Sequence, residues 1–236
     1  MIGPKSRDIL VTVYCVEHGR WTEQSGSFYS KGNLGTFEQR GAAQCEPNYS
    51  SEKQQSIWNG ISRLSRKMSV ISETSAYQAA YDNADVKKRI SSYERKMSAV
   101  PLMNKDTIGV VIGIGEKIVS VDIFADSGTF KALWPKLLKS SALAAINDES
   151  KGILTQDDAA RFLRNLHDKD YARKSGVDEG IEFSVVDNGV NVNALVFGNT
   201  VIHIAAFPQG MNGSDDDNNN VRNQTTERRI RVMDNY

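Results

Sequence analysis

One repeated stretch decides the fold of this chain: residues 114–124 are IGEKIVSVDIF, and residues 197–207 are FGNTVIHIAAF. The two stretches align without a gap, with glycine at the second position and phenylalanine at the last. An apolar run precedes each of them, at residues 108–112 and 192–196. Two apolar runs joined by a short turn with glycine are typical of a β-hairpin. The sequence therefore predicts two similar hairpins and indicates an internal duplication of this unit.

Polar side chains of the two hairpins fall on matching faces. Residues alternate between the faces of a strand, so Ser120, Asp122 and His203 lie on corresponding faces of the second strands. If the hairpins pack side by side, Asp122 and His203 converge as an acid–base pair or as a carboxylate that orients an imidazole. A histidine with an ordinary hydrogen-bond partner and no further role is the structural alternative, and the sequence leaves both open.

Helical patterns surround the hairpins. Ser51 and Gln54 have the spacing of a capping box, Ser127 is placed to cap a helix, and Pro135 suits the first turn of another. The predicted helices cover residues 51–68, 74–82, 84–99, 128–134 and 135–146 and a segment begun at Thr155, and one more strand covers residues 182–186. Because no βαβ rhythm links these elements, we predict an α+β fold with a mostly antiparallel sheet built around the two hairpins.

A dense group of chemically capable side chains lies at the end of a predicted buried strand over residues 8–17 and just after it. Cys15 and Glu17 share one face of that strand, so Glu17 is a candidate general base and Cys15 a candidate nucleophile. His203 is the third catalytic candidate. Cys15 can equally be inert packing, and Glu17 can form a bridge that stiffens the next turn.

The turn after this strand carries the ligand-binding candidates. Arg20 is suited to clamp a phosphate or carboxylate, and Trp21 to stack on a base or sugar. His18 and Asp122 complete the predicted binding group. Cys15, His18, Cys45 and His203 lack the spacing of a zinc motif, so no metal site is predicted. The glycines at 113 and 115 precede a strand and not a helix, which argues against a dinucleotide fingerprint.

The domain organisation follows from composition. Residues 1–208 form one predicted α+β domain, within which residues 22–50 are polar, rich in glycine and predicted to be a long mobile loop. Residues 209–236 begin with a run of Asp and Asn that cannot bury apolar area, so we expect a disordered tail.

Charge and cysteine content limit the function classes. The 236 residues contain 29 Lys and Arg and 29 Asp and Glu, so the formal net charge of zero does not indicate nucleic-acid binding. Two cysteines cannot form a disulfide framework. The sequence contains no run of 18 apolar residues, so no membrane span is predicted. The first residues do not have the pattern of a secretion signal, and we therefore expect a cytoplasmic protein. The native start of the protein can lie further upstream.

Several motifs resemble one family. The sequence is similar to the ARG and rhodanese-phosphatase-superfamily-associated protein domain family over residues 8–208. The motifs that carry the resemblance are residues 13–21 (VYCVEHGRW), Trp58, residues 119–124 (VSVDIF), residues 133–138 (LWPKLL) and residues 201–208 (VIHIAAFP). The family usually has a β-rich portion with a Gly-Glu motif ahead of the first strand, which this chain lacks, and the tail after Pro208 is an addition.

The resemblance gives a direction for function and no mechanism. No activity is established for the family, and its name implies association with ADP-ribosylglycohydrolase, rhodanese and phosphatase genes. We therefore expect a domain that binds or processes a small, anionic, nucleotide-like metabolite related to ADP-ribose or NAD. The alternative is a non-catalytic protein-interaction or structural domain, and a thiol enzyme is a third possibility. The sequence specifies neither a cofactor nor an oligomeric state.

Overall fold

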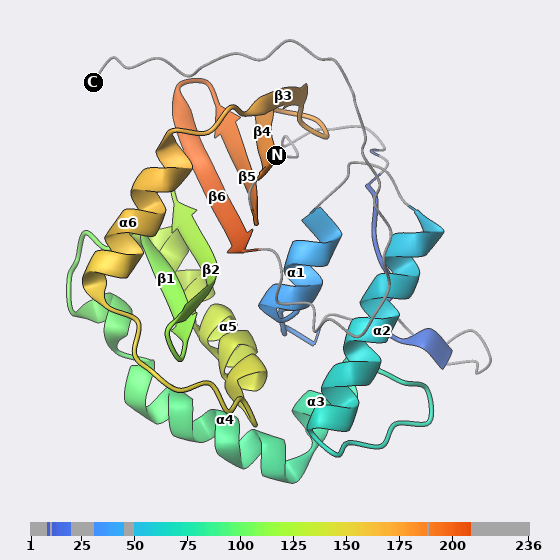
Figure 1. Cartoon of the computed structure of the whole chain (residues 1–236). Helices are drawn as coiled ribbons and strands as arrows, with labels where there is room; N and C mark the ends of the chain where they lie inside the picture. Colours follow the sequence, from blue (N-terminus) through green and yellow to red (C-terminus); the bar gives the residue numbers. More distant parts are fainter. Residues whose placement is uncertain (1–8, 10, 20–30, 45–49, 188, 209–236) are drawn as a thin grey trace.

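The protein is built on one six-stranded antiparallel sheet (Figure 1). We describe it from a computed structural model, which places residues 9, 11–19, 31–44, 50–187 and 189–208. The strands are β1 (Gly109–Ile114), β2 (Lys117–Phe124), β3 (Ala172–Ser175), β4 (Ile181–Asp187), β5 (Val190–Phe197) and β6 (Thr200–Pro208). Their order across the sheet is β1-β2-β6-β5-β4-β3. The predicted α+β class with antiparallel pairing is confirmed.

Both predicted hairpins are present and lie next to each other. β1 pairs with β2, and β5 pairs with β6. Gly115 and Gly198 have φ angles of +61° and +58°, a backbone conformation that glycine adopts without strain, so each can close its turn. β2 and β6 then pair with each other, and Asp122 lies opposite Ala205 while Phe124 lies opposite His203. The two similar hairpins therefore meet inside the sheet, at the β2–β6 pair.

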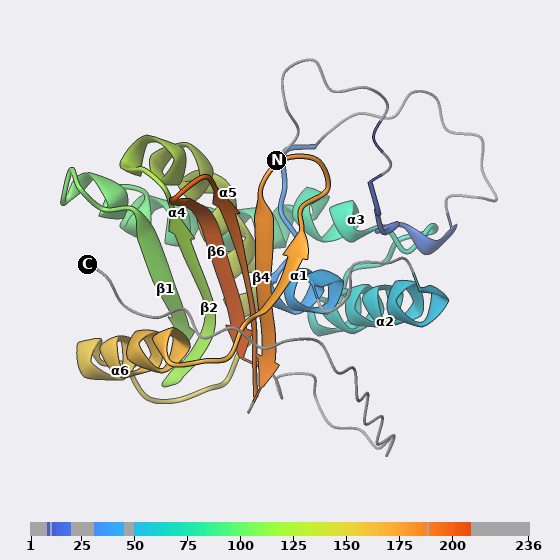
Figure 2. The ribbon, with the colours of Figure 1, turned by 90° about the horizontal axis from the view of Figure 1, so that it is seen from above.

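Helices cover both sides of the sheet (Figure 2). α6 (Gln156–His167) lies on one side, where Leu166 packs with Val121, Val192 and Ala206. α5 (Ser127–Ala145) lies on the other side with α4 (Ala84–Met97), and its Phe130 and Trp134 pack with Phe124.

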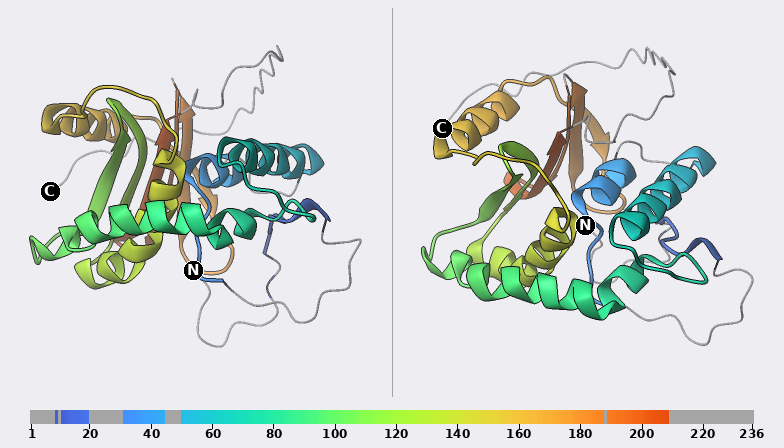
Figure 3. Two further views of the ribbon diagram at one scale, coloured as in Figure 1. Left: turned by 90° about the horizontal axis from the view of Figure 1, so that it is seen from below. Right: turned by 60° about the horizontal axis from the view of Figure 1, so that its bottom comes forward.

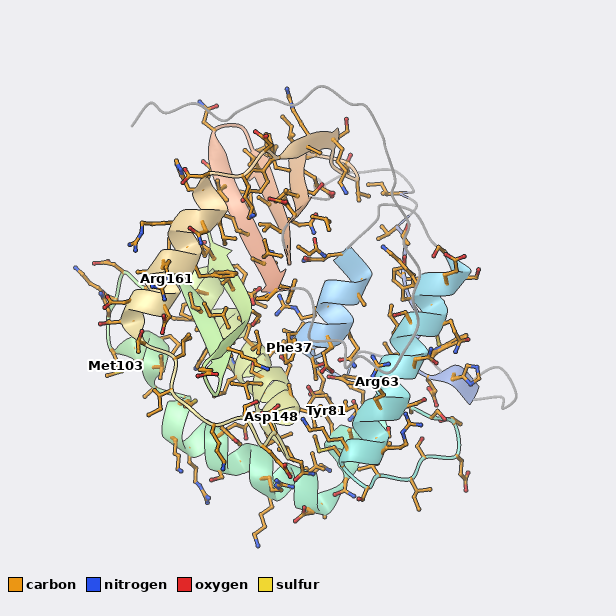
Figure 4. All side chains as sticks on the ribbon, viewed as in Figure 1. Phe37, Arg63, Tyr81, Met103, Asp148 and Arg161 are labelled. Carbon is orange, nitrogen blue, oxygen red and sulfur yellow. The ribbon has the colours of Figure 1, made fainter. Side chains whose placement is uncertain are left out.

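Three further helices extend the α5 side of the molecule (Figure 3). They are α1 (Phe37–Gln44), α2 (Ser51–Lys67) and α3 (Tyr77–Asp82), and a short 3-10 helix covers Val100–Leu102. α2, α3, α4 and the end of α5 share one apolar core. Tyr81 lies inside it (Figure 4), and both Tyr77 and Tyr81 donate their hydroxyl protons to the carbonyl of Leu34. Burial raises the pKa of Tyr81 to about 12. The neutral phenol is therefore the form that this core accepts.

Several predicted boundaries shift. α2 is capped by Ser50, whose side chain accepts from the backbone of Lys53, so the capping box predicted at Ser51 is wrong. The two helices predicted on either side of Pro135 are one helix, α5, capped by Asp126. Tertiary packing of that helix outweighs the single hydrogen bond that a proline removes. The start predicted at Thr155 is confirmed with a full capping box, while β3 was not predicted.

The N-terminal run is not the predicted buried strand. Val11, Val13 and Val16 are 45%, 74% and 47% exposed, and among residues 11–19 the strand pairing is limited to an isolated bridge between Glu17 and Ala76. The segment predicted as one long loop, residues 22–50, contains α1. Residues 20–30, 45–49 and 209–236, and with them the predicted tail, lie outside the described residues.

Candidate functional site

Asp122 and His203 meet where the two hairpins join. Nε2 of His203 lies 3.0 Å from Oδ1 of Asp122. The register explains the contact, because Ala205 lies opposite Asp122 and His203 is two residues before it, on the same face. The predicted convergence of these two side chains is therefore confirmed, while their chemical roles stay a prediction.

Arg40 of α1 completes this group. Its Nη1 lies 3.0 Å from Oδ2 of Asp122, and its Nη2 lies 2.5 Å from Oδ1. The side chain of Asp122 has no solvent exposure, whereas those of Arg40 and His203 are 18% and 34% exposed. Burial alone would raise the pKa of Asp122, but hydrogen bonds from His203 and Arg40 outweigh it and lower that pKa. Asp122 is therefore an ionised carboxylate held by two donors.

Two aromatic rings hold the donors in place. The ring of Phe124 stacks on His203 with 4.6 Å between centroids and 10° between planes. The guanidinium of Arg40 lies 4.9 Å from the centroid of Phe207. Such contacts restrict the rotation of both polar side chains, so Arg40, Asp122 and His203 form a pre-organised cluster, which we call the triad.

The triad borders a pocket of about 860 Å³. Residues 11–14 and 16, α1, Ile57 of α2 and the strands β3 to β6 form its walls. Arg40 and His203 line it together with the amides Gln39, Gln44 and Asn193, while Val13, Tyr14 and Leu195 add apolar surface. One pocket thus offers polar groups at the triad and apolar walls beside the N-terminal segment.

The N-terminal motif makes contacts of another kind. Oε1 of Glu17 accepts a hydrogen bond of 2.6 Å from the hydroxyl of Thr74. The side-chain amide of Gln54 pairs with both backbone groups of Cys15, at 2.8 Å each. The thiol of Cys15 lies 3.2 Å from the carbonyl oxygen of Glu17. These bonds attach the motif to α2 and to the segment before α3.

Close packing accounts for two more motif residues. A Cβ on Gly19 would lie 2.8 Å from the Cα of Thr74, so only glycine fits there. His18 contacts Trp58 edge to face, with ring centroids 4.3 Å apart. His18 of the N-terminal family motif and Trp58 of the second motif are therefore neighbours in space.

The structure divides the predicted site residues into groups. Asp122 and His203 belong to the triad, and His203 lines the pocket. Glu17, Cys15 and His18 do not line the pocket, which takes their neighbours Tyr14 and Val16 instead. Arg20, Trp21 and Cys45 lie outside the described residues. The predicted roles of all these residues stay predictions.

Sequence reasoning missed Arg40, which lies in the segment predicted to be a loop. A signal was available in Asp122, because a buried carboxylate requires a cation or several donors. The sequence does not say which of its many arginines supplies that cation. Within the described part of the chain, no three His, Cys, Asp or Glu side chains gather as metal ligands.

A comparison with family models decides the relationship. The model of the ARG and Rhodanese-Phosphatase-superfamily-associated Protein domain matches residues 1–207. The chain belongs to this family. The triad, the pocket and the N-terminal motif of this ARG and Rhodanese-Phosphatase-superfamily-associated Protein domain all lie within the match.

Other comparisons add no relative. No curated protein and no solved structure matches the chain significantly. None of the helices that the structure describes combines the length and apolar character needed to cross a membrane.

Proposed function

We propose that this domain binds a small, anionic, nucleotide-like metabolite in the pocket beside the triad, with His203 as its acid–base group. The observation that carries the proposal is the position of His203, which lines the pocket while Asp122 holds its Nε2. A histidine oriented by a buried carboxylate is the usual arrangement of a group that exchanges protons with a ligand.

The size and chemistry of the pocket support a small molecule. Its volume of about 860 Å³ lies within the range of about 300–1,000 Å³ that is typical of such sites. The side chains of Tyr14, Val13 and Leu195 suit the flat faces of a base, and the amides of Gln39 and Asn193 suit hydroxyl groups of a sugar. A nucleotide-like ligand presents both kinds of surface.

The metabolite class comes from the family. Its name refers to association with ARG, which we take to mean ADP-ribosylglycohydrolase, so ADP-ribose and NAD are the first candidates. Arg20 and Trp21 stay in the proposal as anion clamp and stacking residue. They follow Val16, which lines the pocket, by four and five positions.

Isothermal titration calorimetry with ADP-ribose, NAD and AMP tests the proposal. We expect binding to the full chain and a loss of at least tenfold in affinity in His203→Ala, because the variant removes a ligand contact. His167→Ala is the matched control, since His167 lies at the end of α6 and does not line the pocket. Absence of heat with all three compounds, or equal affinities for both variants, would contradict the proposal.

One observation favours the alternative of a non-catalytic interaction domain. The motif side chains Glu17 and Cys15 are used in hydrogen bonds within the chain, at Thr74 and at the backbone of Glu17. If the motif only stiffens the fold, Glu17→Gln lowers the melting temperature and leaves ligand heats unchanged. If Glu17 acts on the ligand, the variant weakens binding at an unchanged melting temperature.

A further inference from the structure

His203 has one ring nitrogen committed to the fold. Nε2 faces Asp122, whose carboxylate also holds both terminal nitrogens of Arg40. An ionised carboxylate only accepts hydrogen bonds, so Nε2 must carry a proton. While the ring is neutral, the lone pair therefore lies on Nδ1. Among the residues that the structure describes, Nδ1 has no hydrogen-bond partner.

The exposed part of the ring is on the side of Nδ1 or on its open face. Asp122, without solvent exposure, covers the Nε2 edge, and Phe124 stacks on one face. The 34% of the side chain that remains exposed therefore lies away from Nε2. A ligand in the pocket therefore meets His203 away from Nε2.

Each of the other charged side chains that line the pocket, within the described residues, is paired with a side chain of opposite charge. Arg40 is paired with Asp122, and Nζ of Lys174 lies 3.0 Å from Oε2 of Glu182, another residue of the wall. These four side chains sum to no net charge. Among the groups placed here, only His203 can add a positive charge by taking up a proton from solvent.

We propose, on the basis of the function proposed above, that the pocket binds an anionic oxygen at Nδ1 of His203 and that binding is coupled to the uptake of one proton by this imidazole. The ligand class is a phosphate ester or another strong acid that stays ionised near neutral pH. Asp122 and Arg40 act as positioning residues, because Asp122 fixes the tautomer of His203 and Arg40 holds Asp122.

Calorimetry with ADP-ribose in buffers of different ionisation enthalpy counts the protons. The pyrophosphate of ADP-ribose has no proton to exchange near neutral pH, so any uptake occurs on the protein. We expect one proton per ligand at a pH where the imidazole of the free protein is neutral. The dissociation constant then rises about tenfold for each pH unit above that point. His203→Gln, which keeps a donor toward Asp122, is expected to lose this slope, whereas His167→Gln keeps it.

Nitrogen NMR of the imidazole rings gives a second readout. The chain has three histidines, His18, His167 and His203, so the His203 signals can be assigned with the two variants. We expect the Nε2–H tautomer in the free protein and a doubly protonated ring with ligand. Sulfate, which carries no proton near neutral pH, supplies the anion alone and is the second probe.

The outcomes separate the two proposals. If ADP-ribose does not bind and sulfate nevertheless protonates His203, the nucleotide proposal fails and the anion site stands. If ADP-ribose binds without proton uptake and with unchanged His203 signals, the pocket proposal stands and this inference is overturned. If neither probe changes the His203 nitrogens, the inference is overturned as well.

Discussion

Asp122 is a charged side chain without access to solvent, and donors from two other elements, α1 and β6, satisfy it. Taking a carboxylate out of water costs several kcal/mol unless donors surround it. Arg40 supplies two and His203 supplies one. The opposite strand contributes Ala205, whose methyl group leaves room for them. The polar seam between the hairpins is thus compatible with a packed sheet.

Removing this charge is expected to destabilise the fold. Asp122→Asn leaves the guanidinium of Arg40 without its counter-ion, which costs about 3–5 kcal/mol for a buried pair and less here, because Arg40 keeps some solvent contact. Urea unfolding at neutral pH measures the loss. Asp126→Asn is the control, since Asp126 is an exposed helix cap and asparagine caps equally well. Equal stability of the Asp122 variant and the wild type would contradict this account of the triad.

The ionisation of Asp122 also predicts how the stability difference between wild type and Asp122→Asn depends on pH. Burial opposes ionisation of Asp122, but the hydrogen bonds from His203 and Arg40 lower its pKa in the folded state. The stabilisation is therefore complete above the unfolded pKa of about 3.9 and is lost as the pH falls through the lower folded value. We expect the difference between wild type and Asp122→Asn to shrink as the pH falls below about 4. A constant difference down to acid unfolding would exclude this linkage.

At the level of single residues, the sequence predicted two of the three residues of the triad. The alternation of two aligned strands placed Asp122 and His203 on one face, and the register of β2 and β6 brings them together. Arg40 could not be predicted in this way, because its position depends on how α1 crosses the sheet. The alternating pattern also gave a wrong prediction for Val11 and Val13, which are exposed. Such a pattern indicates that the chain is extended, but it does not identify a neighbouring strand or helix that would bury the side chains.

At the level of elements, α1 shows why a short helix escapes prediction. Its sequence FEQRGAAQ has no apolar stripe and contains a glycine. The structure explains Gly41, because a Cβ there would lie 3.2 Å from the Cβ of Phe207. Asn191 donates to the carbonyl of Gly41, and Asn193 donates to Gln44. Polar contacts and close approach hold α1 on the sheet, and a hydrophobic pattern does not record them.

Substitution of glycine by alanine is expected to change stability in opposite directions at two positions in different elements. A Cβ on Gly109 would lie 2.5 Å from the carbonyl oxygen of Asp122 and 2.9 Å from the Cα of Ile123, so Gly109→Ala forces β1 away from β2. Gly60 lies inside α2, and its nearest neighbour would be 3.5 Å away, in ordinary contact. We expect Gly109→Ala to destabilise by more than about 1 kcal/mol, and Gly60→Ala to stabilise by about 0.5–1 kcal/mol. Thermal unfolding of both variants measures these effects. A shift of the melting temperature in the same direction for both variants would refute the packing argument.

At the scale of the whole molecule, the last strand of the described residues and the family match end together. β6 ends at Pro208, and the match ends at residue 207. We expect a chain shortened after Pro208 to keep the melting temperature and the ligand affinity of the full chain. Every contact of the triad and of the pocket described above lies before that point. A lower melting temperature in the shortened chain would show that residues 209–236 contribute to the fold.

The seam between β2 and β6 has a property that follows from its register. Asp122 lies opposite Ala205, which is its own counterpart in the repeat, and Val121 and Ile123 lie opposite the counterparts of each other. A pseudo-twofold axis therefore passes through the middle of the chain, as in a homodimer fused into one polypeptide. Ser120 is the counterpart of His203 and Ala205 that of Asp122, so the polar pair exists in one of two equivalent orientations. Because Ser120 stands where a second histidine would complete the symmetry, the two hairpins carry a single oriented imidazole at this seam.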